Sequence, residues 1–174
     1  MKRREVGVAT RRAAGKGASD DKLRRAAARR RRLRAHAEAQ IEEYLRAVGF
    51  DDPAELKEQG AYRLEYGEVQ GFAGVHAEGS KLLYTVTAHV LPLPSDKDLV
   101  VPLMRELLEA NTLATGPARL AIVGDSVAAV ISDHADLVPD EDFGRYIDST
   151  LGVAEWAVKD LGKKYGGTTR RRKR

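Results

Sequence analysis

The alternation of hydrophobic and polar positions predicts a helix followed by three strands in the first half of the chain. Apolar side chains recur at helical spacing within residues 35–48, and Gly49 supplies a stop signal. Apolar and polar residues then alternate over 62–66, 69–77 and 82–91, as in half-buried strands. Because the links between these strands are short, the pattern indicates an antiparallel meander.

The second half of the chain predicts a helix, two strands and a final helix. The first of these helices covers about 96–111, and strands follow at 119–123 and 127–131. Gly124-Asp125 between the two strands is a hairpin signal. Acidic residues after Pro139 then favour the start of a long helix. The expected fold class is therefore α+β, a five-stranded antiparallel sheet with helices in the order α-β-β-β-α-β-β-α.

Two glycines interrupt the second predicted strand, at Gly71 and Gly74. A glycine inside a strand marks either a bulge or a close approach of another backbone. The pattern leaves both alternatives open.

Charge divides the chain into three parts. Residues 1–34 contain fourteen Lys or Arg against three acids, a net charge of +11, and residues 163–174 contain seven bases and no acid. Because the whole chain carries only +4, residues 35–162 carry −14. A partner would meet an acidic body between two basic ends.

These differences predict one folded domain over 35–165, flanked by basic tails. Residues 166–174 form the C-terminal tail, and residues 1–34 form an extension that is largely disordered or a solvent-exposed helix. Residues 1–18 hold almost no large apolar side chain, which is typical of disorder. A helix start is expected at Ser19, which is followed by two acids.

Composition favours a cytoplasmic protein. The chain has no cysteine, which excludes disulfides and thiolate metal sites and fits a reducing compartment. No apolar run approaches the roughly 20 residues that span a bilayer. The basic N-terminus is not followed by the apolar stretch of a secretory signal, although the Arg- and Ala-rich residues 1–37 also fit a transit peptide.

The search for catalytic or metal-binding groups returns no assignment. His76 and His89 lie on neighbouring predicted strands and would suit a metal pair, but a solvated polar face explains them equally well. The same alternatives hold for His134 between Asp133 and Asp136. No phosphate-binding glycine loop, dinucleotide fingerprint or nucleophile elbow occurs. We therefore expect no enzyme, no cofactor and no metal site.

The basic ends are candidates for contact with phosphate, on nucleic acid or on an anionic membrane surface. The alternative is that they fold back on the acidic body. The candidate residues are Arg29, Arg30, Arg31, Arg32, Arg34, Arg170, Arg171, Arg172, Lys173 and Arg174.

Trp156, the only tryptophan, is the candidate anchor for a protein partner. At 100° per residue it lies away from the core stripe of the last helix, with Val153 and Tyr146 partway round on the same side. Burial by another element is the alternative. Leu103 and Leu107 on the preceding helix are expected to serve the core or a dimer contact.

Residues Leu103–Leu113 read L-M-R-E-L-L-E-A-N-T-L, and a strand at Ala118–Val123, a hairpin, an acidic helix start and a long helix follow. Over about 38–165 this order resembles the YbjN-like and type III secretion chaperone-like superfamily. The resemblance implies a bacterial α+β sandwich that dimerises. Members of the secretion branch are small acidic homodimers that hold an effector segment partly unfolded.

The resulting hypothesis is a non-catalytic, chaperone-like or adaptor protein that binds a protein segment as a homodimer. The alternative is a nucleic-acid-associated protein that contacts the phosphate backbone through its basic tails. Tail-driven binding would weaken steeply with salt, which separates the two.

Overall fold

The computed structural model describes the backbone of residues 6–114 and 116–165, with side chains from residue 21 onward. Its elements, in chain order, are α1 (Val6–Ala47), the 3-10 turn η1 (Pro53–Leu56), β1 (Lys57–Glu58), β2 (Ala61–Tyr66), β3 (Val69–Glu78), β4 (Lys81–Pro92), α2 (Lys97–Leu113), β5 (Arg119–Val123), β6 (Ser126–His134) and α3 (Asp140–Tyr165).

The strands form one antiparallel sheet in the order β1-β2-β3-β4-β6-β5, which confirms the α+β class. The sheet has six strands rather than the expected five. The additional strand, β1, consists of two exposed residues and pairs with the start of β2. Two exposed residues carry no alternation of apolar and polar side chains, so the pattern could not predict this strand.

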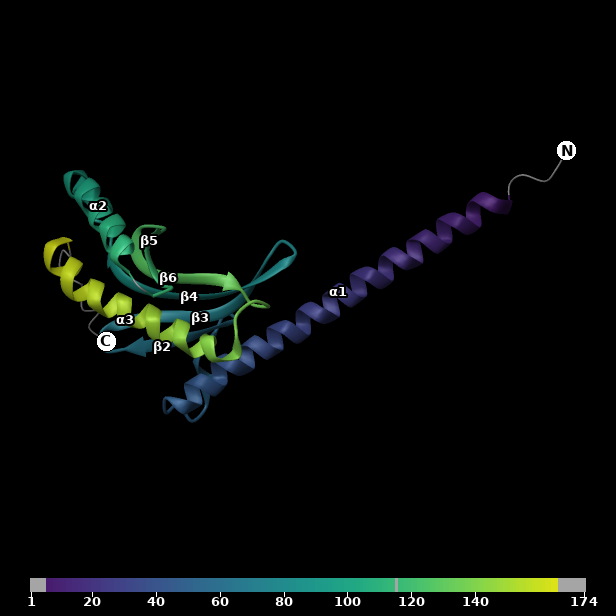
Figure 1. Ribbon diagram of the computed structural model, residues 1–174, viewed down its shortest axis with the longest axis horizontal. Coiled ribbons are helices and arrows are strands. Elements are labelled where there is room, and N and C mark those ends of the chain that lie inside the picture. Colours follow the sequence, from purple (N-terminus) through teal and green to yellow (C-terminus); the bar gives the residue numbers. More distant parts are fainter. Residues whose placement is uncertain (1–5, 115, 166–174) are drawn as a thin grey trace.

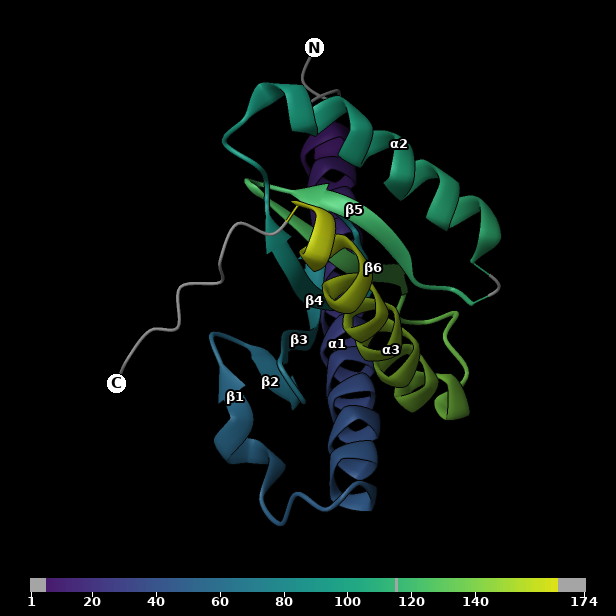
Figure 2. The same cartoon turned by 90° about the vertical axis from the view of Figure 1, so that its left-hand side faces the viewer.

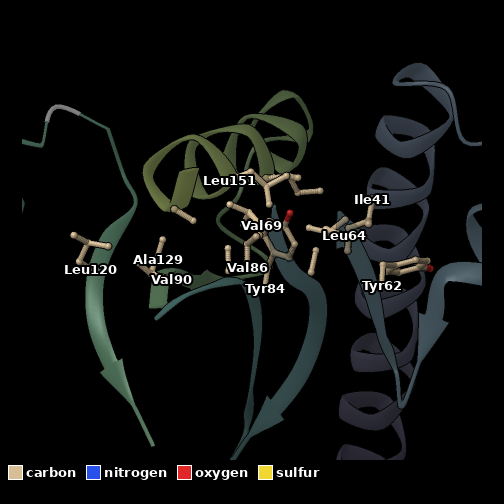
Figure 3. Packing of buried hydrophobic residues seen from close by; sticks show 14 of the residues in the cluster. Ile41, Tyr62, Leu64, Val69, Tyr84, Val86, Val90, Leu120, Ala129 and Leu151 are labelled. Atoms are coloured by element: carbon tan, nitrogen blue, oxygen red, sulfur yellow. The ribbon is translucent and has the colours of Figure 1, made fainter. Parts of the chain in front are cut away.

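One face of the sheet carries the hydrophobic core. Tyr84 and Val86 of β4 point to this face, where Leu151 of α3 lies above them (Figure 3). The opposite face is more polar, and there Thr85 of β4 hydrogen-bonds Ser132 of β6 over 2.9 Å. Packing helices on one face and leaving the other to solvent is the usual arrangement of an antiparallel sheet.

Helix α1 is docked only along its C-terminal part. Ala37, Ile41 and Leu45 are buried, and Ile41 approaches the side chain of Leu64 on β2 (Figure 3). His36 Nε2 lies 2.8 Å from the carboxylate of Asp140 at the start of α3. The N-terminal part of the same helix extends far beyond the sheet (Figure 1).

The predicted helix start at Ser19 is not observed, because the backbone of α1 is helical from Val6. Of the two alternatives for the N-terminal extension, disorder or an exposed helix, residues 6–34 have the helix. Residues 1–5 lie outside the described residues. Alanine, arginine and lysine are the common residues here, and all three favour helix. Their summed helix propensity outweighs the unfavourable propensity of Gly15 and Gly17.

Two glycines have the roles that the sequence indicated. Gly49 has a φ of 102°, a left-handed conformation that ends α1. At Gly71, a Cβ atom would lie 2.7 Å from the carbonyl oxygen of Thr87, so the close-approach alternative is correct. The strand keeps a regular register there, and the irregularity of the sheet lies instead in β4, between His89 and Leu91.

Candidate functional site

A groove of about 520 Å³ opens where the C-terminal end of α2, the start of β5 and the middle of α3 meet. Figure 2 shows these three elements beside one another at one edge of the sheet. The residues that line the groove are mostly small or apolar: Ala110, Asn111, Leu113, Ala114, Gly116, Ala118, Leu120, Asp148, Ser149, Gly152, Val153 and Trp156. We call this site the α2–α3 groove.

Asn111 holds α2 against β5 at one end of the groove. Its side-chain amide donates to the carbonyl oxygen of Leu120, and its side-chain oxygen accepts from the amide of the same residue, both over 2.8 Å. This pair of bonds satisfies a backbone unit on the edge strand of the sheet. Asn111 belongs to the Leu103–Leu113 pattern, but sequence reasoning assigned it no role because its partner lies on another element.

Glu106 ties α2 to the end of α3 on the other side. Its carboxylate accepts from Lys164 Nζ over 3.0 Å and from the hydroxyl of Tyr165 over 2.8 Å. The hydrogen bond from Lys164, together with that from Tyr165, lowers the pKa of Glu106 against a smaller opposing effect of burial. These contacts and those of Asn111 set the width of the groove between the two helices.

Trp156 forms part of the apolar wall of the groove and is 49% exposed. Val153, half-buried, lies one turn earlier on the same helix, and Leu113 of α2, 81% exposed, lines the opposite side. An exposed tryptophan between apolar side chains is the kind of residue that anchors protein interfaces. The structure thus brings together Trp156 and Val153, two of the three residues predicted for partner contact.

Tyr146, the third predicted residue, does not line this groove. Its ring stacks on that of Tyr84, with centroids 6.0 Å apart, and its hydroxyl donates to Asp133 over 3.3 Å. Ten residues of helix separate it from Trp156, a rise of about 15 Å. An angle around the helix axis does not show how far apart two residues lie along it, so contact of Tyr146 with a partner stays a prediction separate from this groove.

A second groove, of about 460 Å³, lies on the other side of α3, between the end of α1 and β2. Tyr66 of β2 and Val48, just after α1, line it and are about half exposed. On its wall the hydroxyl of Tyr44 donates to Asp148, and burial, together with this bond, raises the pKa of Tyr44. Helix α3 is thus flanked by two apolar grooves, and Gly152 lines both.

The two leucines predicted for the core or a dimer contact, Leu103 and Leu107, are buried within this chain. Besides Leu99 and Leu113 near its two ends, α2 leaves three apolar side chains exposed on the opposite side of the helix, Val101, Met104 and Leu108. We call these three residues the outer face of α2.

The histidines do not form a cluster. His76 pairs across the sheet with Leu83 and His89 with Ala128, several residues apart along β4. His134 Nε2 instead lies 3.2 Å from Nζ of Lys81. In the part of the chain that the structure describes, no group of three or more His, Asp or Glu is placed to hold a metal ion.

The predicted phosphate-contacting residues of the N-terminal extension lie on α1. Arg29, Arg31, Arg32 and Arg34 are exposed, and Arg30 is half-buried. The C-terminal candidates, residues 170–174, lie outside the described residues. Within the described ranges, no helix has an apolar stretch long enough to cross a membrane.

Comparison with solved structures identifies the fold. A chain of the ExsC–ExsE complex superimposes with a TM-score of 0.55 at 18% identity, covering 74% of this chain and 96% of that one. This chain shares its fold with that chain of the ExsC–ExsE complex. The fold expected from the resemblance is therefore confirmed.

Two more distant similarities accompany this match to the chaperone fold. The ExoU–SpcU complex of the type III secretion system of Pseudomonas aeruginosa gives a TM-score of 0.47 at 18% identity, covering 67% of this chain and 93% of that chain. YbjN from E. coli gives 0.45 at 16% identity, covering 71% and 90%. No protein-family model and no curated protein matches the sequence.

Proposed function

We propose that this protein is a cytoplasmic, non-catalytic, chaperone-like or adaptor protein that holds a segment of another polypeptide in the α2–α3 groove. The observation that carries the proposal is Trp156, which is half exposed in an apolar groove beside the sheet edge. Covering an indole that is already partly desolvated removes apolar surface from water at little entropic cost, since the side chain has only two rotatable bonds.

The position of the groove supports an extended or helical peptide as its occupant. Strand β5 is the last strand of the sheet, and Asn111 already bonds the outward N–H and C=O of Leu120, so an added strand could pair only with the part of β5 beyond Leu120 while its side chains enter the groove. A helix lying in the groove would use the same apolar wall. The chain of similar fold in the ExsC–ExsE complex belongs to a protein–protein complex, which is consistent with this role.

The charge of the protein indicates which kind of partner segment fits the α2–α3 groove best. Residues 35–162 carry a net charge of −14, and Asp148 lies in the groove itself. Complementary charge raises association rates and excludes wrong partners. We therefore expect the bound segment to combine apolar anchors with neighbouring Lys or Arg residues.

The test is affinity capture from host lysate treated with nuclease, comparing the wild type with the double variant Trp156→Ala/Leu113→Ser. These substitutions remove both apolar walls of the groove at exposed side chains, so folding is expected to be retained. The double variant should bind the groove partners at least about 10-fold more weakly than the wild type, or fail to capture them. The reason is that anchor residues of this kind contribute about 2 kcal/mol or more to binding.

The matched control is Tyr66→Ala/Leu137→Ser, which also replaces one exposed aromatic residue and one exposed leucine but leaves the α2–α3 groove intact. The control should capture the same polypeptides as the wild type. Loss of capture in the control alone would assign the partner to the second groove, which Tyr66 lines, and would contradict the proposal.

The homodimer is part of the same proposal and involves the outer face of α2. Val101, Met104 and Leu108 follow one another at spacings of three and four, which places them in one apolar stripe. Burying this stripe against its copy in a second chain removes it from water and leaves the α2–α3 groove open in each protomer.

Nucleic-acid binding, the alternative function, depends on other residues, the basic residues of α1 and of the C-terminal tail over 170–174. The nuclease treatment and the groove variants above therefore separate the two functions. A partner that remains after nuclease and responds to Trp156 belongs to the groove.

A further inference from the structure

The middle of α1 is a strongly basic stretch of helix. Of the thirteen residues from Lys22 to Arg34, eight are Lys or Arg and none is Asp or Glu. At about 1.5 Å per residue this segment covers about 20 Å of helix. We call it the basic segment of α1.

The basic segment presents a row of exposed arginines. Arg25, Arg29 and Arg32 recur at spacings of four and three, so they form one stripe. Counting 100° per residue, this stripe lies roughly opposite the buried Ala37 and Ile41. All three arginines are exposed, and Arg31 is exposed beside them.

These arginines are only weakly engaged by the protein itself. Arg25 pairs with Asp21 within the helix over 3.0 Å, and Arg29 approaches Asp136 at 3.9 Å. Both pairs are exposed and contribute little. Among the residues that the structure describes, no carboxylate lies within the 4 Å ion-pair distance of Arg31 or Arg32. The segment is therefore available to an external anion rather than used to neutralise the acidic body.

The helix that carries this positive charge runs past the negative body and continues beyond it. Figure 1 shows α1 leaving the sheet at an angle and continuing well beyond it. Arg24 lies thirteen residues, about 20 Å of helix, from the buried Ala37. The distance to the sheet itself is shorter, because Leu23 and Arg30 line a pocket together with Ala77 and Leu82, so screening by salt weakens the repulsion of a polyanion by the −14 body without removing it.

We propose that the basic segment of α1 binds duplex DNA, with the helix lying along the major groove and its arginines contacting phosphates. A helix with side chains is about 10–12 Å across and the major groove of B-DNA is about 12 Å wide, so one helix fits. The major groove of an RNA duplex is too narrow and deep for this. The interaction uses none of the residues of the α2–α3 groove and is independent of protein-segment binding there.

The experiment is fluorescence anisotropy of a labelled DNA duplex of about 30 base pairs and mixed sequence. The full-length protein is titrated at several salt concentrations between about 50 and about 300 mM. The test variant is Arg25→Gln, Arg29→Gln, Arg31→Gln and Arg32→Gln together. Far-ultraviolet circular dichroism confirms that the variant keeps its helix content.

The control variant is Lys97→Gln, Arg105→Gln, Arg145→Gln and Lys163→Gln together, which removes the same four charges from α2 and α3. Net charge changes equally in both variants. The C-terminal arginines are present in both, so a difference between the variants reports α1 alone.

The expected result is that the test variant binds at least about 100-fold more weakly than the control at about 0.1 M salt. The slope of log K against log salt should fall in magnitude by about 3.6, because each of the four lost phosphate contacts contributes about 0.9. A third variant with lysine at the same four positions should stay within about threefold of the wild type, because a phosphate contact of this kind depends mainly on charge.

Equal affinity and slope in the test and control variants would overturn the proposal. The proposal would also be overturned if the lysine variant lost as much DNA affinity as the glutamine variant, because that result would exclude charge-driven contact with the DNA backbone. Two parallel titrations test the chemistry of the partner, one with an RNA duplex of equal length and one with phosphatidylserine-containing vesicles. If the protein bound the RNA duplex or the vesicles more tightly than DNA at equal salt, the proposal would likewise be overturned.

Discussion

At the residue scale, the glycines of α3 show how one helix meets different surroundings. A Cβ atom at Gly144 would overlap the ring of Tyr44 on α1, whereas nothing lies within 4 Å of such an atom at Gly152 or Gly162. Close contact between α1 and α3 is therefore possible only because residue 144 has no side chain. Gly152 and Gly162 have no such close contact with another element of the chain.

Gly144→Ala and Gly162→Ala are predicted to change stability in opposite directions. Alanine favours a helix interior over glycine by about 1 kcal/mol, so Gly162→Ala should raise the free energy of unfolding by up to that amount. At residue 144 the overlap with Tyr44 should outweigh this gain and give a net loss of about 1–2 kcal/mol. Thermal unfolding measures both, and stabilisation by Gly144→Ala would show that the two helices are not in tight contact.

At the element scale, α1 is one helix whose surroundings change along its length. Leu23 and Ile41 are eighteen residues apart, five turns, and so lie on the same side of the helix. Ile41 is fully buried, whereas Leu23 is 66% exposed. The same side of the helix is therefore core near its C-terminal end and largely solvent-exposed near residue 23.

Alanine substitutions should reproduce this division. Ile41→Ala is expected to lower the free energy of unfolding by about 2–5 kcal/mol, because it leaves a cavity in the core. Leu23→Ala should change it by no more than about 0.5 kcal/mol. Denaturant titration measures both values, and a large effect at Leu23 would mean that the exposed part of α1 packs against the body or another copy.

The tie between α2 and α3 should depend on pH. The pKa of Glu106 is lowered in the folded protein, chiefly by its hydrogen bond from Lys164, so its stabilising contribution is present above the unfolded pKa of about 4.3 and is lost as pH falls through the lowered folded pKa. We predict that Glu106→Gln is less stable than the wild type at pH 7 and that this small difference disappears toward pH 3. A difference that persists at pH 3 would show that ionised Glu106 does not make the tie.

At the scale of the whole molecule, three surfaces are arranged separately around one core. The α2–α3 groove opens at the edge of the sheet, the outer face of α2 lies beside it, and the basic segment of α1 extends away (Figure 1). Leu108, 69% exposed, belongs to the outer face and does not line the groove.

Leu108→Glu is therefore predicted to convert the proposed homodimer to a monomer while leaving the proposed groove binding intact. A charge buried in an apolar contact between two copies is strongly unfavourable, whereas on an exposed position of one chain it costs little. Light scattering after size-exclusion chromatography measures the mass, and capture of the groove partner measures binding. An unchanged dimer would exclude the outer face of α2 as the contact.

Much of the fold could be predicted from the sequence because it depends on local periodicity. Spacing of apolar side chains indicates which segments are helices or strands, and the observed sheet keeps the expected meander and hairpin. The two-residue β1 and the full length of α1 could not be predicted, since neither has an apolar pattern of its own. Exposure of Trp156 also followed from local geometry, as its angle around α3 is set by its position in the chain.

The sequence by itself thus determined the elements, their order, the charge of each segment and the side of α3 on which Trp156 lies. Only the tertiary structure decided that Leu113 faces Trp156 across a groove, that Asn111 holds the edge strand, and that Tyr146 packs on Tyr84 instead. The physical reason is that periodicity orients a side chain relative to its own helix or strand. Which side chain stands opposite depends on how separate elements pack, and no local pattern carries that information.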